Sequence, residues 1–191
     1  MAPGGSGNPA EPGFQIRPAR PRDAASFAEM LTIVVREGKY IRTEEVGRDL
    51  RSVKRRFRES WDDEHAWFVA VGDADGKVIG SLSIAREDHA VTRHVASIGM
   101  MVAPEWRSRG VGSALMAAAV EWAKRMGVEK LALSVYPDNE PALALYRKFG
   151  FVDEGRLKGH SKKAIGYRDE VLMGRWLIEP PPGGEQPGAT P

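Results

Sequence analysis

The chain has 191 residues, with 28 Lys and Arg against 26 Asp and Glu, and therefore a formal net charge of +2. A chain of this length can bury a substantial core, and the balanced charge disfavours a protein whose main role is to coat nucleic acid. The absence of Cys excludes disulfides, thiolate nucleophiles and Cys-ligated metal sites. Neither a secretory signal nor a run of about 18 apolar residues is found, so we expect a cytoplasmic protein that does not enter the membrane.

Both ends of the chain, 1–13 and 179–191, are rich in Pro and Gly and offer almost nothing to bury. We therefore expect two disordered tails. Between them, residues 14–178 show no internal repeat and no long linker, which predicts a single domain.

The first half of this domain is expected to contain four strands and two helices. An apolar stripe from Phe27 to Val35 predicts the first helix, with Asp23 as its cap. Thr43 is expected to cap a second helix that runs to about residue 60 and carries a strongly basic face. The strands show the alternation and turn residues typical of antiparallel pairing, and are expected at 14–17, 66–71, 78–85 and 95–103.

After Pro104 strands and helices alternate. A helical stripe begins at Val111 and ends before Gly127, and a shorter one follows Asn139 and ends before Gly150. The order β-α-α-β-β-β-α-β-α-β-β indicates an α+β fold with a crossover in its middle. The strands of this half are expected at 130–136, 151–157 and 167–176.

Residues 107–113, Arg-Ser-Arg-Gly-Val-Gly-Ser, lie between a strand and an amphipathic helix. Glycines at such a turn let the backbone approach a ligand, and the first helical turn presents unpaired N–H groups at the positive end of the helix dipole. The segment therefore predicts a phosphate or diphosphate site, a plain turn being the alternative. The Walker pattern is absent, and Leu115 replaces the third Gly of the dinucleotide fingerprint, which disfavours nucleotide hydrolases and Rossmann enzymes.

Two motifs together resemble the GNAT superfamily of N-acetyltransferases. The first is Arg107-x-x-Gly110-x-Gly112 after the strand Ile-Gly-Met-Met-Val, and the second is Ser-Val-Tyr-Pro-Asp-Asn-Glu-Pro-Ala-Leu-Ala-Leu-Tyr-Arg-Lys-Phe-Gly-Phe at 134–151. The resemblance extends over 14–178 and implies three layers, with a mixed, mostly antiparallel sheet of about seven strands and about four helices. Residues 155–174 are similar to the branch that acetylates phosphinothricin and L-amino acids.

The resemblance implies acetyl-CoA as co-substrate and no metal. It places the diphosphate on the N–H groups of 107–113 and the pantetheine arm beside 100–102, where an N–H near Met101 would stabilise the thioester oxyanion. Asn139 would hydrogen-bond the arm, and Ala142 would pack beside it. The cofactor residues implied in this way are Met101, Val102, Arg107, Ser108, Arg109, Gly110, Val111, Gly112, Ser113, Asn139, Ala142 and Tyr146.

Two residues are candidates for proton transfer. The family motif implies that Tyr146 protonates the departing CoA thiolate, although its place on an apolar stripe by itself indicates a core residue. Glu37 ends the first helix, where the family commonly forms the acceptor wall, so it is a candidate for binding an ammonium group or relaying its proton. The alternative for Glu37 is a solvated charge at a helix end.

The acceptor side is marked by fewer signals. In relatives that acetylate amino acids an arginine before the central strand holds the substrate carboxylate, which implies Arg86 and Arg93 as substrate residues, with surface ion pairs as the alternative. Because side chains alternate along a strand, only one of Asp169 and Glu170 is expected to face the pocket.

The expected function is acetyl-CoA-dependent transfer of an acetyl group to the primary amine of a small molecule, a free amino acid or analogue, by direct attack in a ternary complex. The alternatives are a protein N-terminal or lysine acetyltransferase, and a non-catalytic acyl-CoA- or RNA-binding module. The four His residues lack metal-binding spacing, and the basic run 48–58 is interpreted as a solvated helix face. Homodimerisation is suggested by analogy alone.

Overall fold

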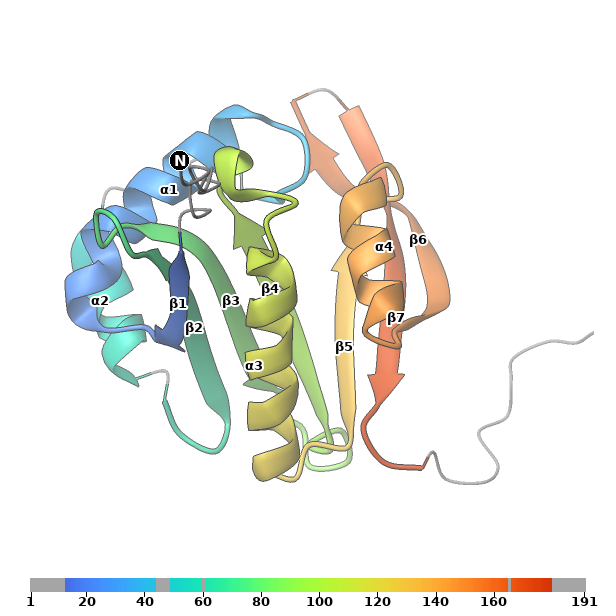
Figure 1. Ribbon diagram of the computed structural model, residues 1–191. Helices are drawn as coiled ribbons and strands as arrows, with labels where there is room; N and C mark the ends of the chain where they lie inside the picture. The colour runs from blue at the N-terminus through green and yellow to red at the C-terminus, as the bar shows by residue number, and fades with distance from the viewer. Residues whose placement is uncertain (1–12, 44–48, 60, 165, 180–191) are drawn as a thin grey trace, which may run out of the picture.

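The computed structural model describes residues 13–43, 49–59, 61–164 and 166–179, within which seven strands form one sheet (Figure 1). The strands are β1 Phe14–Pro18, β2 His65–Gly72, β3 Val78–Arg86, β4 Val95–Val102, β5 Lys130–Val135, β6 Val152–Lys163 and β7 Gly166–Trp176. The helices are α1 Ala24–Arg36, α2 Leu50–Glu59, α3 Val111–Arg125 and α4 Glu140–Lys148. The expected α+β fold and its order of elements are confirmed.

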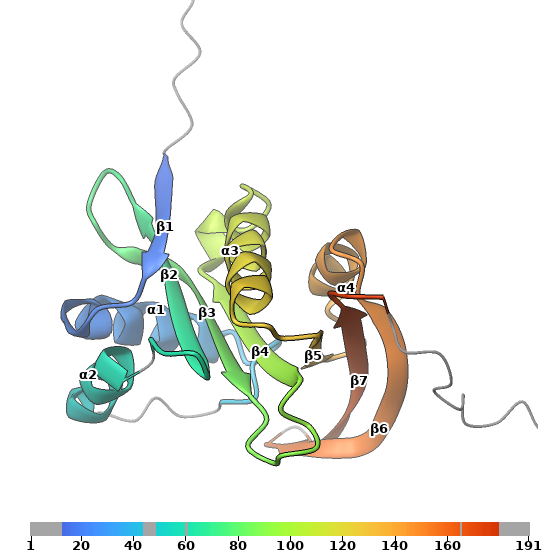
Figure 2. The ribbon, with the colours of Figure 1, turned by 90° about the horizontal axis from the view of Figure 1, so that it is seen from below.

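The sheet separates two pairs of helices, so that the molecule has three layers (Figure 2). On one face Phe27 of α1 and Phe57 of α2 pack edge to face on Trp67 of β2, with ring centroids 5.1 to 5.6 Å apart. On the other face the buried residues of α3 and α4, among them Leu115 and Leu143, form the larger core. Burying apolar groups on both faces stabilises the sheet in the middle of the fold.

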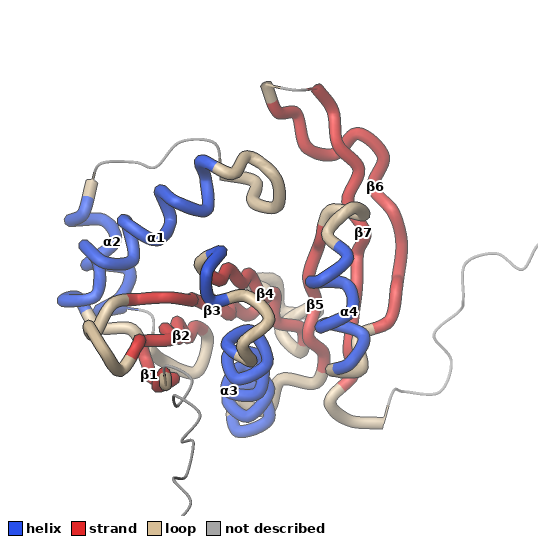
Figure 3. Tube along the Cα trace, turned by 45° about the horizontal axis from the view of Figure 1, so that its top comes forward, coloured by secondary structure: helices blue, strands red, loops and turns tan. Residues whose placement is uncertain are grey.

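The strand order β1-β2-β3-β4-β5-β7-β6 contains one parallel pair, β4 and β5, and every other pair is antiparallel. The parallel pairing is short, because it joins Val95–Ser97 to Lys130–Ala132 and goes no further. Beyond these residues β4 continues to Val102 and β5 to Val135 without pairing to each other. The two strands therefore part in the centre of the sheet (Figure 3).

The first turn of α3 packs closely on the sheet at Gly80 of β3. A methyl group at Gly80 of β3 would lie 2.9 Å from Cγ1 of Val111 and 3.1 Å from Cδ1 of Leu115. Carbon atoms pack at about 3.5 to 4.0 Å, so only glycine leaves room for these two side chains.

Three local expectations differ from the structure. Helix α2 begins at Leu50 and not after Thr43, and residues 44–48 lie outside the described residues. Strand β6 extends to Lys163, because the polar stretch after Leu157 pairs with β7 although it carries no apolar alternation. The carboxylate of Asp23 makes no cap bond to α1, since it accepts from the backbone N–H of Arg20 at 2.7 Å and from the guanidinium of Arg17.

The expected tails fall almost entirely outside the described residues, at 1–12 and 180–191. No helix in the described ranges combines the length and the apolar character needed to cross a bilayer.

Candidate active site

A cavity of about 850 Å³ opens where β4 and β5 part. Residues from the four helices and from five strands, β2, β3, β4, β5 and β7, line it. Ten residues expected at the cofactor or catalytic site lie on its wall, namely Met101, Val102, Arg107, Ser108, Gly110, Gly112, Ser113, Asn139, Ala142 and Tyr146. The structure thus brings together two motifs that lie about 30 residues apart in the chain.

The turn before α3 has the backbone shape of an anion-binding loop. Ser108 and Gly110 have positive φ angles of 60° and 84°, and α3 begins directly after Gly110. The first internal bond of the helix runs from the N–H of Ala114 to the carbonyl of Gly110 at 3.0 Å. The N–H groups of Val111, Gly112 and Ser113 come before Ala114 in the chain and, like the first N–H groups of any helix, have no acceptor within the helix. They are oriented for an anionic ligand.

Arg107 leads into this turn and is held by two partners. Its Nη1 and Nη2 donate to the two carboxylate oxygens of Glu37 at 2.9 and 2.5 Å, and its Nε donates to the carbonyl of Val102 at 3.2 Å. Glu37 is absent from the cavity wall within the described part of the chain. Both oxygens of Glu37 bind Arg107, and the expected role of Glu37 at the acceptor stays a prediction.

Two further residues of the turn point away from the cavity. The guanidinium of Arg109 lies over the ring of Trp106, 5.6 Å from its centroid. The side chain of Val111 is buried in the core between α3 and the sheet. Neither residue is among those that line the cavity, and their expected cofactor contacts stay a prediction.

Helix α4 presents Tyr146 to the opposite wall. Asn139 caps the helix by accepting the N–H of Ala142 at 3.3 Å, which leaves its side-chain amide N–H groups free of this bond. Tyr146 is 7% exposed, and its ring lies 6.0 Å from that of Phe151. Burial raises the pKa of Tyr146 to about 12, so its phenol stays protonated at neutral pH and is able to donate a proton.

Residues 39–42 follow α1 and contribute to the cavity wall, and we call them the strap. The strap is tied to the β6–β7 hairpin, because Arg168 donates to the carbonyl of Lys39 and Lys163 donates to that of Ile41. Figure 3 shows this segment reaching from α1 toward β6 and β7. Tyr40, Ile41 and Arg42 line the cavity.

A buried carboxylate anchors the strap. Nε of Arg42 donates to Oε1 of Glu170 at 2.9 Å, Nη2 donates to Oε2 of Glu170 and to Oγ of Ser134, and Ser161 also donates to Glu170. Burial by itself raises the pKa of Glu170, but hydrogen bonds from Arg42, Ser161 and Ser134 outweigh it and lower the pKa to about 2. Glu170 is thus the strand residue that faces the cavity, whereas Asp169 binds Arg156 on the opposite face.

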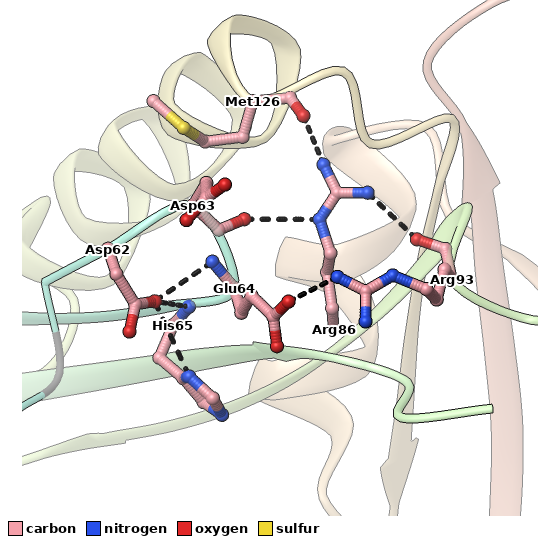
Figure 4. A network of polar contacts seen from close by, with 7 residues as sticks. All are labelled: Asp62, Asp63, Glu64, His65, Arg86, Arg93 and Met126. Carbon is pink, nitrogen blue, oxygen red and sulfur yellow. Dashed lines mark hydrogen bonds and ion pairs between the residues drawn. The ribbon is translucent and has the colours of Figure 1, made fainter. Parts of the chain in front are cut away.

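Arg86 and Arg93 lie outside the cavity wall, in a separate polar network (Figure 4). Arg86 donates to the backbone carbonyls of Asp63, Arg93 and Met126, and Arg93 pairs with Glu64. The donors of Arg86 are thus taken up by backbone carbonyls, and the expected role of both residues at the acceptor carboxylate stays a prediction.

Arg42 and Tyr136 also line the cavity, although no sequence pattern predicted them. Tyr136 follows β5 within the second motif, but no feature of the motif separates it from a core tyrosine. Arg42 stands alone in a loop, and its partner Glu170 is 128 positions away. No local pattern was available to predict this pair. In the described ranges, no three His, Cys, Asp or Glu residues are grouped so that they could bind a metal ion.

The parted sheet, the anion-binding turn and the buried phenol together define a fold of the GNAT type. The family described as Acetyltransferase (GNAT) family matches residues 29–151, and the chain belongs to that family.

Two curated relatives and one solved structure illustrate the similarity. The chain is 37% identical over 102 residues to the L-amino acid N-acetyltransferase AaaT of Escherichia coli, a match that covers 53% of this chain and 63% of AaaT. It is 33% identical over 108 residues to the mycothiol acetyltransferase of Saccharomonospora viridis, covering 54% of this chain and 35% of that protein. The matched part therefore spans less than two thirds of each curated relative.

The solved structure is a GNAT superfamily phosphinothricin acetyltransferase from Sinorhizobium meliloti in complex with acetyl-CoA. It matches with a TM-score of 0.77 at 23% identity, over 91% of this chain and 97% of that chain. The likeness shows that the whole described domain shares this fold.

Proposed function

We propose that this protein transfers the acetyl group of acetyl-CoA to the primary amine of a small molecule, a free amino acid or analogue, by direct attack in a ternary complex. The observation that carries the proposal is a single cavity that joins the anion-binding turn at 108–113, the phenol of Tyr146 and the strap. The similarity to AaaT supports an amino acid as acceptor.

The residues on the donor side of the cavity fit acetyl-CoA, which supplies an activated thioester when bound. The N–H groups of Gly112 and Ser113 are placed to bind the diphosphate at the positive end of the helix dipole. Asn139 has side-chain amide N–H groups left to bind the pantetheine arm. Met101 and Val102 of β4 pair with β3 but not with β5, and their side toward β5 offers backbone groups to the same arm and to the thioester oxygen.

Tyr146 is the group that we assign to protonate the sulfur. Its raised pKa keeps the phenol in the acid form. A thiolate with a Cys-like pKa of about 8.5 is a weaker base than the phenolate, so the proton is donated while the carbon–sulfur bond breaks, and the proton that the amine nitrogen loses on forming the amide goes to water. Tyr146 is therefore a general acid in this proposal, and the transferred proton is replaced from solvent after the products leave.

The amine must be neutral before it attacks. The carboxylates on the described cavity wall are Asp49 and Glu170, and the pKa of Glu170 near 2 makes it a very weak base. An α-amine with a pKa of about 7.7 to 8 is partly neutral at physiological pH. We therefore propose that the amine loses its proton to water in the cavity and that no side chain acts as a dedicated base.

The strap favours a small acceptor over a protein. A peptide needs a groove that is open at both ends, whereas Arg168, Lys163 and Glu170 hold the strap across the acceptor end of the cavity. We accordingly propose a small-molecule amine as the partner, with neither membrane nor nucleic acid, in the cytoplasm. Protein acetylation and a non-catalytic acyl-CoA- or RNA-binding role remain the alternatives to test.

The experiment measures thiol release from acetyl-CoA with free amino acids, phosphinothricin, polyamines and N-terminal peptides, together with calorimetry of acetyl-CoA binding. We expect binding of acetyl-CoA and turnover with small amines that carry a carboxylate. Turnover with peptides alone would contradict the small-molecule assignment. Binding without any turnover would contradict catalysis, and no binding would contradict the cofactor site.

A further inference from the structure

Arg42 has donor groups that the protein does not use. Glu170 occupies the edge of the guanidinium formed by Nε and Nη2, and Ser134 accepts a second bond from Nη2. No hydrogen bond between described residues involves Nη1 of Arg42, and the side chain is 58% exposed at the cavity wall. Among the described residues, Nη1 therefore has no hydrogen-bond partner, on a guanidinium whose other nitrogens are held.

The fixed position of Arg42 matters for binding. A free arginine loses rotamer freedom when it binds a ligand, but the buried carboxylate of Glu170 has already immobilised this one. Ionised Glu170 also keeps the guanidinium paired when the cavity is empty. A carboxylate fits this place, because its oxygens accept strong, charge-assisted hydrogen bonds from the N–H groups of Nη1.

A second observation points to the same place. The hydroxyl of Tyr136 is buried and has no hydrogen-bond partner among the described residues, although buried hydroxyls are ordinarily paired. Tyr136 is 4% exposed and lines the same cavity as Arg42. The guanidinium of Arg168, 3.9 Å from the ring centroid, holds the ring in place.

We propose that Nη1 of Arg42 and the hydroxyl of Tyr136 form the subsite that binds the carboxylate of the acceptor. This inference rests on the proposed acetyltransferase function and narrows its acceptor to amines that carry a carboxylate, above all α-amino acids. The carboxylate accepts hydrogen bonds from both groups, and the amine is then directed back along the cavity toward Tyr146 and the parted strands.

The experiment compares each L-amino acid with its carboxamide, which keeps the shape and removes the negative charge. The quantity measured is the ratio of kcat/KM for acid and amide, in the wild type and in each variant. Differences in amine reactivity between the two substrates cancel when ratios are compared between proteins. The informative variants are Arg42→Gln and Tyr136→Phe, because the second removes only an oxygen that has no partner in the described structure.

We expect the acid-to-amide ratio to fall at least tenfold in Arg42→Gln and several-fold in Tyr136→Phe, as the loss of charged and neutral hydrogen bonds predicts. Arg56→Gln is the matched control, since Arg56 of α2 lines the same cavity and has the same charge. An equal fall in Arg56→Gln, or no fall in Tyr136→Phe with the protein folded, would overturn the assignment of this subsite.

The proposed function can fail separately from this inference. Amines that turn over with no preference for acid over amide in the wild type would overturn the subsite and leave the acetyltransferase in place. Acetyl-CoA that binds without turnover of any amine would overturn the function itself.

Discussion

Glu37 and Arg107 form a two-pronged ion pair that joins the C-terminal end of α1 to the turn before α3, 70 positions further along the chain. The pair has a consequence for the acetyl-CoA site that we propose. Arg107 provides positive charge beside the anion-binding turn, and Glu37 neutralises part of it. A diphosphate that approaches the turn meets both charges.

We expect Glu37→Gln to tighten the binding of acetyl-CoA about two- to threefold. The substitution removes an anion near the diphosphate, and at aqueous dielectric such a charge at about 8 Å is worth about half a kcal/mol. Glutamine still accepts a bond from Arg107. Calorimetry at low and moderate salt measures the effect, which should shrink as salt screens it.

Glu29→Gln is the control for Glu37→Gln, because Glu29 is an exposed carboxylate on the same helix. Arg107→Gln should weaken binding. A weaker affinity in Glu37→Gln would mean that the carboxylate orients Arg107 rather than competing with the diphosphate.

Replacing Tyr146 by Phe tests the proposed general acid. We expect kcat to fall about 100-fold or more, in the range typical for loss of acid catalysis, with the Kd of acetyl-CoA nearly unchanged. Steady-state kinetics and calorimetry measure the two quantities. Tyr167→Phe is a suitable control, since Tyr167 is 71% exposed on β7, and equal activity of the two variants would contradict the role of Tyr146.

The pH profile tests the same phenol in another way. A pKa raised to about 12 means that Tyr146 keeps its proton until well above pH 10. The rate should therefore rise with pH as the amine becomes neutral, and then stay level up to about pH 11. A descending limb near pH 10 that Tyr146→Phe abolishes would show that the phenol ionises like an exposed tyrosine.

Glu170 is expected to make the fold sensitive to acid. Its folded-state pKa of about 2 lies below the ordinary value of 4.5, so its stabilising contribution is present above pH 4.5 and is lost as pH falls toward 2. We expect Glu170→Gln to lower the free energy of unfolding by about 1 to 3 kcal/mol at pH 7, as for other charged hydrogen bonds.

Urea unfolding at pH 7, 5, 4 and 3 measures this difference, which should narrow as the pH falls. Glu59→Gln is the control, because Glu59 is an exposed residue at the end of α2. A difference between Glu170→Gln and the wild type that stays constant down to pH 3 would show that the charge of Glu170 is not responsible.

Gly80→Ala tests the close approach of α3 to the sheet. The new methyl group would lie 2.9 Å from Val111, which overpacks a buried site, and we expect a loss of about 1 to 3 kcal/mol in unfolding free energy. Thermal or urea denaturation measures it. Gly155→Ala on β6 has open space around the new methyl group and should be nearly neutral, so equal losses would contradict the packing argument.

The sequence by itself determined the fold class, the anion-binding turn and the position of Tyr146, because each depends on contiguous residues. Gly110 and Gly112 indicate a turn whatever residues surround them in the fold. The helical spacing from Asn139 to Tyr146 places the cap residue and the tyrosine on the same helix, α4. Hydrophobic periodicity likewise predicts most strands and helices. When one face is buried, apolar residues recur at every second position of a strand and at every third or fourth position of a helix.

Tertiary structure decided which residues meet at the strap end of the cavity and which partners the charged side chains take. Glu37 binds Arg107 across 70 positions, and Arg42 binds Glu170 across 128. Arg86 is of a residue type that suits a substrate carboxylate, but in the fold it donates to three backbone carbonyls. A charged side chain takes whichever opposite charge or carbonyl the packed fold brings within reach, and periodicity carries no information about partners that meet only after the chain has folded.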